Sequence, residues 1–203
     1  KILIRDFGEV EKLQISVKGP SDFVSNADTK AEKIIINELM VDPEPSIQLP
    51  IAEYVELYNR ANYPLSLKGW KLIIDDSESP IGSIVIPKNA YLLLIDEADS
   101  LVFENYNFQT ISLPNLNNTE GYIGLFDDDD QVVHEVLYHK QWYQNPNKEN
   151  GGWSIEMMDA NNYCSGQGNW KSCENNLGGS PGFENSVQQE NPDTVAPLIN
   201  EIL

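Results

Sequence analysis

The chain has 203 residues, with 32 acidic and 13 basic side chains and a formal net charge of −19 at pH 7. So acidic a surface repels phosphate backbones, which excludes nucleic-acid binding through a basic footprint. Hydrophobic residues make up 40% of the sequence, enough for a core, and no apolar run reaches the roughly 18 residues of a membrane span. No signal peptide is visible and the first residue is not Met, so we expect a segment of a longer chain.

The first 33 residues predict one strand followed by a linker. Leu13, Ile15 and Val17 alternate with polar residues, which is the period of a strand. Ser25-Asn26-Ala27 matches the remnant of a common tag-cleavage procedure. We therefore interpret 1–33 either as an N-terminal strand and linker or as a segment derived from recombinant cloning.

The first strand of the main domain is predicted at 34–40, a run rich in β-branched residues. A second strand follows within 53–59, where Val55 and Leu57 alternate with Glu56 and its polar neighbours. This period of two predicts a strand with one buried face. Glu53 and Glu56 then fall on opposite faces, which argues against a paired-carboxylate glycosidase site.

The stretch 53–74 contains two strand-like runs joined by a polar turn, and we expect it to form a hairpin that nucleates the fold. The apolar parity of the second run changes at Gly69-Trp70. A glycine at a parity change predicts a β-bulge, which would turn Trp70 into the core.

The remaining chain predicts more short strands and no helix of usable length. A central strand is expected at 91–95 and an edge pairing near Ile111 and Leu113. Other strands are predicted at 83–86, at 121–126 and 131–138 as a hairpin, and at 153–157. About eight strands separated by turns predict an all-β fold, an antiparallel β-sandwich. After a linker, 188–203 contains a second Ile-Asn-Glu, which we interpret as the first strand of a following domain.

Several motifs, taken in order, resemble the lamin tail domain in its bacterial secreted form. They are Ile36-Asn37-Glu38, EYVELYN at 53–59, LSLKGWKL at 65–72, WSIE at 153–156, NW at 169–170, GSPG at 179–182 and NS at 185–186. The resemblance covers 34–187. It implies an immunoglobulin-like sandwich without catalytic residues, carried by multidomain exported proteins beside nucleases, phosphatases or surface domains. The chain lacks the coiled-coil heptads of animal nuclear lamins, so a chromatin role is not expected.

The two cysteines, Cys164 and Cys173, flank a flexible polar segment. Metal ligation would need more ligands at closer spacing. We predict a local disulfide, which places the protein in an oxidising compartment: secreted, at the cell surface or periplasmic. Two free thiols is the alternative.

The acidic run Asp127, Asp128, Asp129 and Asp130 lies between two predicted strands. A hairpin turn needs such polar residues, and the run lacks the spacing of a calcium-binding loop. We interpret it as a turn, with a calcium site as the alternative and no other cofactor expected.

Four further side chains could carry a site. His134 and His139 are separated by an odd number of positions, so they face opposite sides of a strand and are poor co-ligands. We expect them at the surface or an edge. Trp142 and Tyr143 flank a polar loop, where they either contact a ligand or pack into the core.

From these patterns we expect a non-catalytic β-sandwich module of an exported bacterial multidomain protein that acts in binding, surface attachment or domain spacing. The expected partner is a protein or glycan at the cell surface, not nucleic acid. One alternative is an accessory domain of a secreted nuclease or phosphatase whose catalytic domain lies elsewhere. Another is a calcium-stabilised adhesion module.

Overall fold

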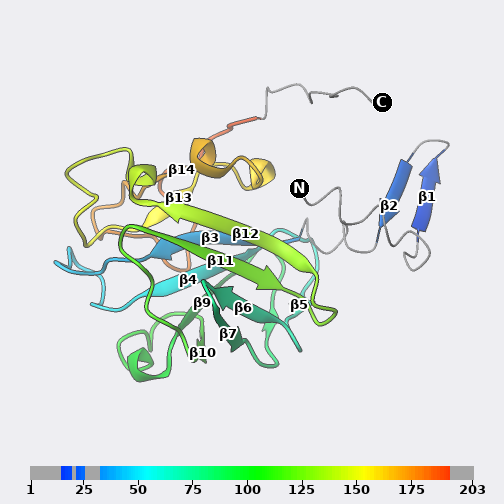
Figure 1. The fold of residues 1–203 in the computed structure, drawn as a ribbon, viewed down its shortest axis with the longest axis horizontal. Helices are drawn as coiled ribbons and strands as arrows, with labels where there is room; N and C mark the ends of the chain where they lie inside the picture. Colours follow the sequence, from blue (N-terminus) through cyan, green and yellow to red (C-terminus); the bar gives the residue numbers. More distant parts are fainter. Residues whose placement is uncertain (1–14, 20–21, 26–32, 193–203) are drawn as a thin grey trace.

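A computed structural model of the chain describes residues 15–19, 22–25 and 33–192 (Figure 1). In the first of these ranges, β1 (Ile15–Gly19) pairs with β2 (Asp22–Ser25) as an antiparallel ribbon. The predicted strand around Leu13 therefore lies only partly inside the described residues. The strand predicted at the end of 188–203 lies outside them.

The main domain, 34–187, is built from two sheets (Figure 1). The order in the larger sheet is β10 (Phe108–Ile111), β9 (Tyr91–Asp96), β4 (Tyr54–Asn59), β3 (Ile34–Met40), β13 (Ile155–Met157), β14 (Trp170–Ser172). The order in the smaller sheet is β12 (Val132–His139), β11 (Glu120–Phe126), β6 (Lys71–Ile74), β7 (Ser77–Pro80). A two-residue pair joins β5 (Leu65–Ser66) to β8 (Val85–Ile86). Short 3₁₀ helices complete the fold: η2 (Glu97–Asp99), η3 (Lys140–Tyr143), η4 (Ala160–Asn162) and η5 (Gly166–Asn169).

These two sheets confirm the predicted immunoglobulin-like sandwich. The predicted first strand coincides with β3, and the predicted hairpin is formed by β11 and β12. The predicted edge strand is present as β10, but it runs parallel to β9 rather than antiparallel. None of the helices in the described part of the chain is long and apolar enough to cross a membrane.

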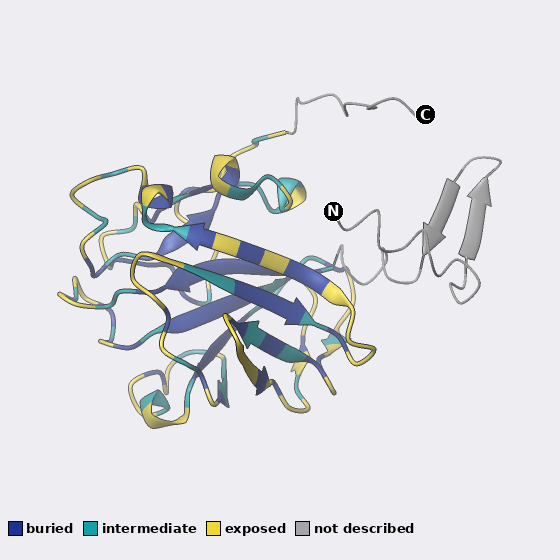
Figure 2. Cartoon of the chain, viewed as in Figure 1, coloured by how far each residue is buried: buried dark blue, intermediate teal, exposed yellow. Residues whose placement is uncertain are grey.

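The central strands of the larger sheet are buried on both faces (Figure 2). Val55 and Leu57 of β4 join the main core between the sheets. Tyr54, which precedes Val55, joins a second cluster on the opposite face, where its ring meets Phe103 edge-on with ring centroids 5.9 Å apart. The prediction of one buried face for this strand was therefore wrong. Side chains pack on both faces of β4, and within the strand only Tyr58 is partly exposed.

The stretch 53–74 does not form a hairpin. Its first run is β4 in the larger sheet, whereas its second run passes through β5 to β6 in the smaller sheet. Gly69 lies in the turn between β5 and β6, with φ +83°. A Cβ at this position would meet the Asp128 Cβ at 2.9 Å. The predicted bulge was therefore wrong, because the glycine serves a left-handed turn. Trp70 is buried in the core as predicted.

A bulge occurs instead in β3, where the register with β4 shifts between Ile36 and Glu38. Ile36 belongs to the main core. An extra residue in the strand lets Asn37 and Glu38, although consecutive, both serve the opposite face of the sheet.

Candidate functional site

The face of the larger sheet that points away from the smaller sheet is covered by residues 179–187, here called the C-terminal strap. Its sequence is Gly-Ser-Pro-Gly-Phe-Glu-Asn-Ser-Val. The strap is anchored by side chains from three adjacent strands, β4, β3 and β13. It therefore joins a segment late in the chain to the centre of the sheet.

Three glutamates lie under the C-terminal strap. Glu38 of β3 is the cross-strand partner of Glu56 on one side and of Glu156 on the other. All three are 0% exposed. Three carboxylates side by side in a buried layer cannot all be ionised without a large desolvation and repulsion cost, unless donors surround them.

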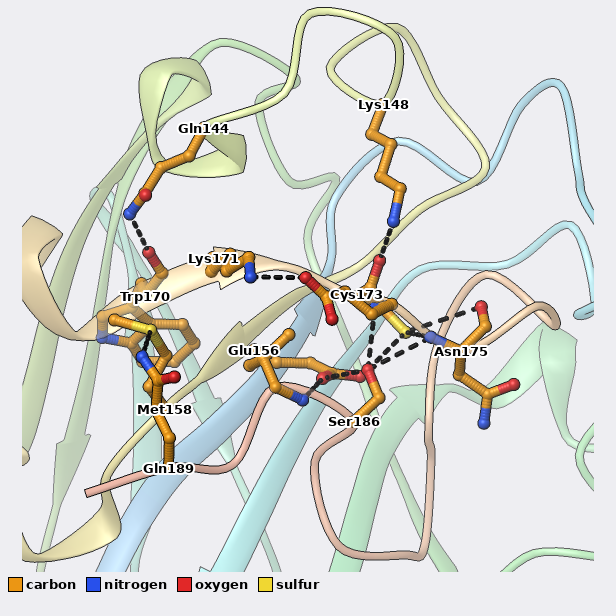
Figure 3. A network of polar contacts seen from close by, with 12 residues as sticks. Gln144, Lys148, Glu156, Met158, Trp170, Lys171, Cys173, Asn175, Ser186 and Gln189 are labelled. Atoms are coloured by element: carbon orange, nitrogen blue, oxygen red, sulfur yellow. Dashed lines mark hydrogen bonds and ion pairs between the residues drawn. The ribbon is translucent and has the colours of Figure 1, made fainter. Parts of the chain in front are cut away.

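The C-terminal strap supplies many of those donors. The Ser180 backbone N–H donates to Glu38 Oε1 at 2.9 Å, and the Gly182 N–H donates to Glu56 Oε2 at 2.6 Å. The Ser186 hydroxyl donates to Glu156 Oε2 at 2.8 Å, as Figure 3 shows. These hydrogen bonds satisfy the buried carboxylates and attach the strap to the sheet.

Burial and then the neighbouring charge of Glu156 raise the pKa of Glu38, the nearby Ser154 hydroxyl and hydrogen bonds from Tyr54 and Ser180 lower it, and the resulting pKa is about 7. Burial and Glu38 raise the pKa of Glu56 well above its usual range. One oxygen, Glu38 Oε2, has no well-aligned hydrogen-bond partner among the described residues. Glu38 and Glu56 therefore keep their protons to a higher pH than ordinary glutamates do.

An amide pair closes one end of this layer. The Asn37 Nδ2 donates to Asn185 Oδ1 at 2.7 Å, and the Asn185 Nδ2 donates to the carbonyl oxygens of Asn37 and Met157. Both side chains are buried. This pair fixes the end of the strap to β3 and β13.

A groove of about 520 Å³ opens beyond the amide pair. It is lined by Asn37, Tyr58, Arg60, Tyr91, Met157, Met158, Asp159, Ala160, Asn161, Glu184, Asn185, Gln188, Gln189 and Glu190. Its polar side chains are therefore mostly planar amides and carboxylates, the types that fix ligand orientation in binding sites.

One wall of the groove is a pair of stacked tyrosines. Tyr58 of β4 and Tyr91 of β9 are cross-strand partners, with ring centroids 4.6 Å apart and an interplanar angle of 20°. Both are only partly buried. Arg60, on the same side, donates to Asn161 Oδ1 at 2.9 Å, and its guanidinium lies 5.0 Å from the centre of the Tyr163 ring.

Comparison with known proteins identifies the family. The model of the Lamin Tail Domain matches residues 27–140, more than half of the chain. The chain belongs to the lamin tail domain family. The C-terminal strap follows the matched range, yet it covers β3 and β4, which lie inside that range.

Short segments also resemble enzymes. The lamin tail domain chain is 68% identical over 40 residues to an inositol-1-monophosphatase of Rhizobium meliloti (strain 1021) and 68% identical over 37 residues to one of Mesorhizobium japonicum. A 43-residue segment is 56% identical to the inositol-1-monophosphatase of Caulobacter vibrioides. These matches cover about a fifth of the chain, and the chain spans only 14–16% of the length of these relatives.

In this lamin tail domain the acidic run forms the turn between β11 and β12. The buried Asp127 Oδ1 accepts hydrogen bonds from the N–H groups of Asp129 and Gln131, both at 2.9 Å. Asp130 has φ +59° and pairs with Lys71 at 2.8 Å. Ligand oxygens of Asp127, Asp128 and Asp129 lie within 4.8 Å of one another. The turn is observed, and the calcium alternative stays a prediction.

The structure does not contain the predicted disulfide. Cys164 and Cys173 are free thiols, the first exposed and the second buried. The Cys173 Sγ lies 3.3 Å from Ser186 Oγ and accepts the N–H of Asn175, so it belongs to the strap network in Figure 3. The segment between the cysteines folds into η5 and β14 and is not the free loop that the prediction assumed.

Trp142 and Tyr143, predicted as ligand contacts or core residues, are buried and belong to the main core. The Tyr143 hydroxyl donates to the carbonyl oxygen of Trp153 at 3.0 Å. Their position in η3 faces them inward, so neither lines the groove. Trp142 instead lines a second groove, of about 400 Å³, beside β12. The core alternative is observed, and the ligand-contact alternative stays a prediction.

His134 was predicted at the surface or an edge, but it is buried. Its Nδ1 accepts the Ile36 N–H at 3.0 Å, and its Nε2 lies 3.2 Å from the carbonyl oxygen of Tyr163. This arrangement fits the neutral ring with the proton on Nε2. His139 is partly exposed and its Nδ1 accepts the Gln141 N–H, which caps η3. The two histidines therefore serve separate structural roles.

Proposed function

We propose that this lamin tail domain is a non-catalytic ligand-binding module of an exported bacterial multidomain protein, and that the groove beside the C-terminal strap is its ligand site. The observation that carries the proposal is the groove itself. It combines partly exposed aromatic rings, Tyr58 and Tyr91, with amides and carboxylates on a rigid sheet. Concave sites of a few hundred Å³ are the usual places for ligands, and polar groups in them fix the orientation of the ligand.

The position of the buried glutamates supports a binding role rather than catalysis. A general acid or base must come within about 3 Å of the reacting group. Glu38 and Glu156 are covered by the strap and hydrogen-bonded to it, and neither lines the groove. Their contacts instead stabilise the wall that the strap gives to the groove.

The proposal is tested with the full chain on a glycan array and a peptide array. Gln188→Trp places a bulky ring at the exposed rim of the groove, and Tyr58→Ala/Tyr91→Ala removes the tyrosine wall. Tyr63→Ala is the matched control, because Tyr63 is an exposed tyrosine outside the groove. We expect the groove variants to lose the signals that the control keeps. Retention of every signal by both groove variants would overturn the proposal.

A second candidate is an accessory domain of a hydrolase, favoured by the short resemblance to inositol-1-monophosphatases. The resemblance covers about 40 residues, 15% of the first relative, whereas an active site gathers groups from across a chain. We therefore expect no phosphate release from inositol 1-phosphate by this chain alone. Release above the level of a protein-free blank would contradict the non-catalytic assignment.

A further inference from the structure

We propose that the groove takes a cationic group: the side chain of a lysine or arginine from an exposed basic segment of a partner protein. This inference rests on the proposed function, because it names the ligand class of the same groove. Three features support it: the charges at the rim, the tyrosine wall and the charge of the whole chain.

The charges around the groove are mainly negative. Asp159, Glu184 and Glu190 line it, against one guanidinium from Arg60. That guanidinium is already engaged by Asn161 and by the ring of Tyr163. Asp159 is held in place by the N–H groups of Asn161 and Asn191, which fixes its charge at the groove. A cationic ligand is therefore favoured over an anionic one.

The tyrosine wall suits the same ligand. The π face of an aromatic ring attracts an ammonium or guanidinium group within about 6 Å of its centre. Burial and then Tyr58, Glu56, Glu184 and Glu38 raise the pKa of Tyr91, and of these glutamates Glu184 also lines the groove. An aromatic ring next to the carboxylate of Glu184 therefore suits a cation, which both groups attract.

The whole chain, with a formal charge of −19, attracts basic partners over long range. This general attraction is also the main source of false binding, because any polycation would associate weakly with such a surface. The experiment therefore compares variants of equal net charge.

The test uses fluorescence polarisation with a labelled peptide that carries two lysines among glycines and serines, and a twin with glutamates in place of the lysines. Glu184→Gln/Glu190→Gln removes two charges at the groove. Glu97→Gln/Glu104→Gln removes two charges from exposed positions outside the groove, so the net charge is the same. We expect the lysine peptide to bind roughly fivefold more weakly to the groove variant and within about twofold of wild type to the control. Tyr91→Leu should also bind the lysine peptide more weakly than wild type does.

Each outcome decides the inference. Equal weakening by both charge variants would show non-specific association with an acidic surface and would overturn it. Tyrosine-dependent binding of a neutral glycan, without binding of the lysine peptide, would overturn the cationic ligand but support the groove as the binding site. If no peptide and no glycan binds in a way that depends on the groove residues, both this inference and the proposed function are overturned.

Discussion

Glu38 on β3 lies directly opposite Glu56 on β4, and both carboxyl groups are fully buried. Like charges in a cross-strand pair destabilise a sheet when both are ionised. The pair is tolerated because Tyr54 and Ser180 donate to Glu38 and because Asn37 and Gly182 donate to Glu56. The strap is thus attached to the sheet through groups whose charge depends on pH.

The first prediction concerns Glu38 and pH. Its pKa in the folded protein is about 7, above the ordinary value of 4.5, so the folded state holds the proton more tightly. This stabilisation is complete below pH 4.5 and is lost as pH rises to about 7. We expect Glu38 to contribute about 2 kcal/mol more to the unfolding free energy at pH 5.5 than at pH 8. Urea unfolding of wild type and Glu38→Gln at both pH values measures the difference.

If the difference between wild type and Glu38→Gln is the same at both pH values, Glu38 is not titrating in this range. Glu56 is the second member of the pair, and its pKa is also raised. Glu56→Gln should therefore show a pH dependence of the same sign. Glu78→Gln is a control, because Glu78 is an exposed glutamate on β7.

His134 should act in the opposite direction. Burial lowers the pKa of His134, the Tyr163 carbonyl raises it and Arg60 lowers it, so that it falls from 6.5 to about 4. A depressed pKa means that the unfolded chain binds the proton first, so stability is lost as pH falls from 6.5 towards 4. We expect a loss of about 1 kcal/mol between pH 7 and pH 5.5 that is missing in His134→Asn. Without this variant, the opposing effect of Glu38 would mask the loss in wild type.

The sandwich could be predicted from sequence because β3 begins with a β-branched run and the alternation in β12 reports burial on one face directly. The site could not be predicted in the same way. A glutamate between apolar residues, as at Glu56, has the pattern of a solvent-facing position. Only the strap, more than a hundred positions later in the chain, covers it.

The errors have a common physical cause. Local pattern gives the direction of a side chain but not what lies above it. For Trp142 and Tyr143 the sequence leaves both core packing and ligand contact open, and for His134 it predicts a surface or edge position, because the segments that bury these side chains are distant in sequence. The motif GSPG-x-x-NS at 179–186 was the available signal for the strap. Its contacts with the three glutamates could not be predicted from the motif, because they depend on which strands lie side by side in the sheet.

Gly179 tests how tightly the strap packs. A Cβ at this position would lie 2.6 Å from the Tyr54 hydroxyl and 2.8 Å from Glu38 Oε1. Gly179→Ala should therefore displace the strap and lower the unfolding free energy by about 1–3 kcal/mol. Gly168→Ala is the control, because nothing lies within 4 Å of its Cβ position. Thermal melts of both variants suffice, and equal melting temperatures would contradict the tight packing.

The state of the two cysteines tests the prediction of an oxidising compartment, because that prediction depends on a disulfide between them. Cys164 is exposed and Cys173 is buried in the strap network, where burial and then Glu156 raise the pKa of its thiol to about 12. The thiolate is the reactive form, so Cys173 should be inert at pH 8 while Cys164 reacts. We expect one thiol per chain to react with a chromogenic disulfide reagent in the native protein, and two after denaturation without reductant. If neither reacts after denaturation, a disulfide has formed, and residues 164–173 must then adopt a conformation other than η5 and β14.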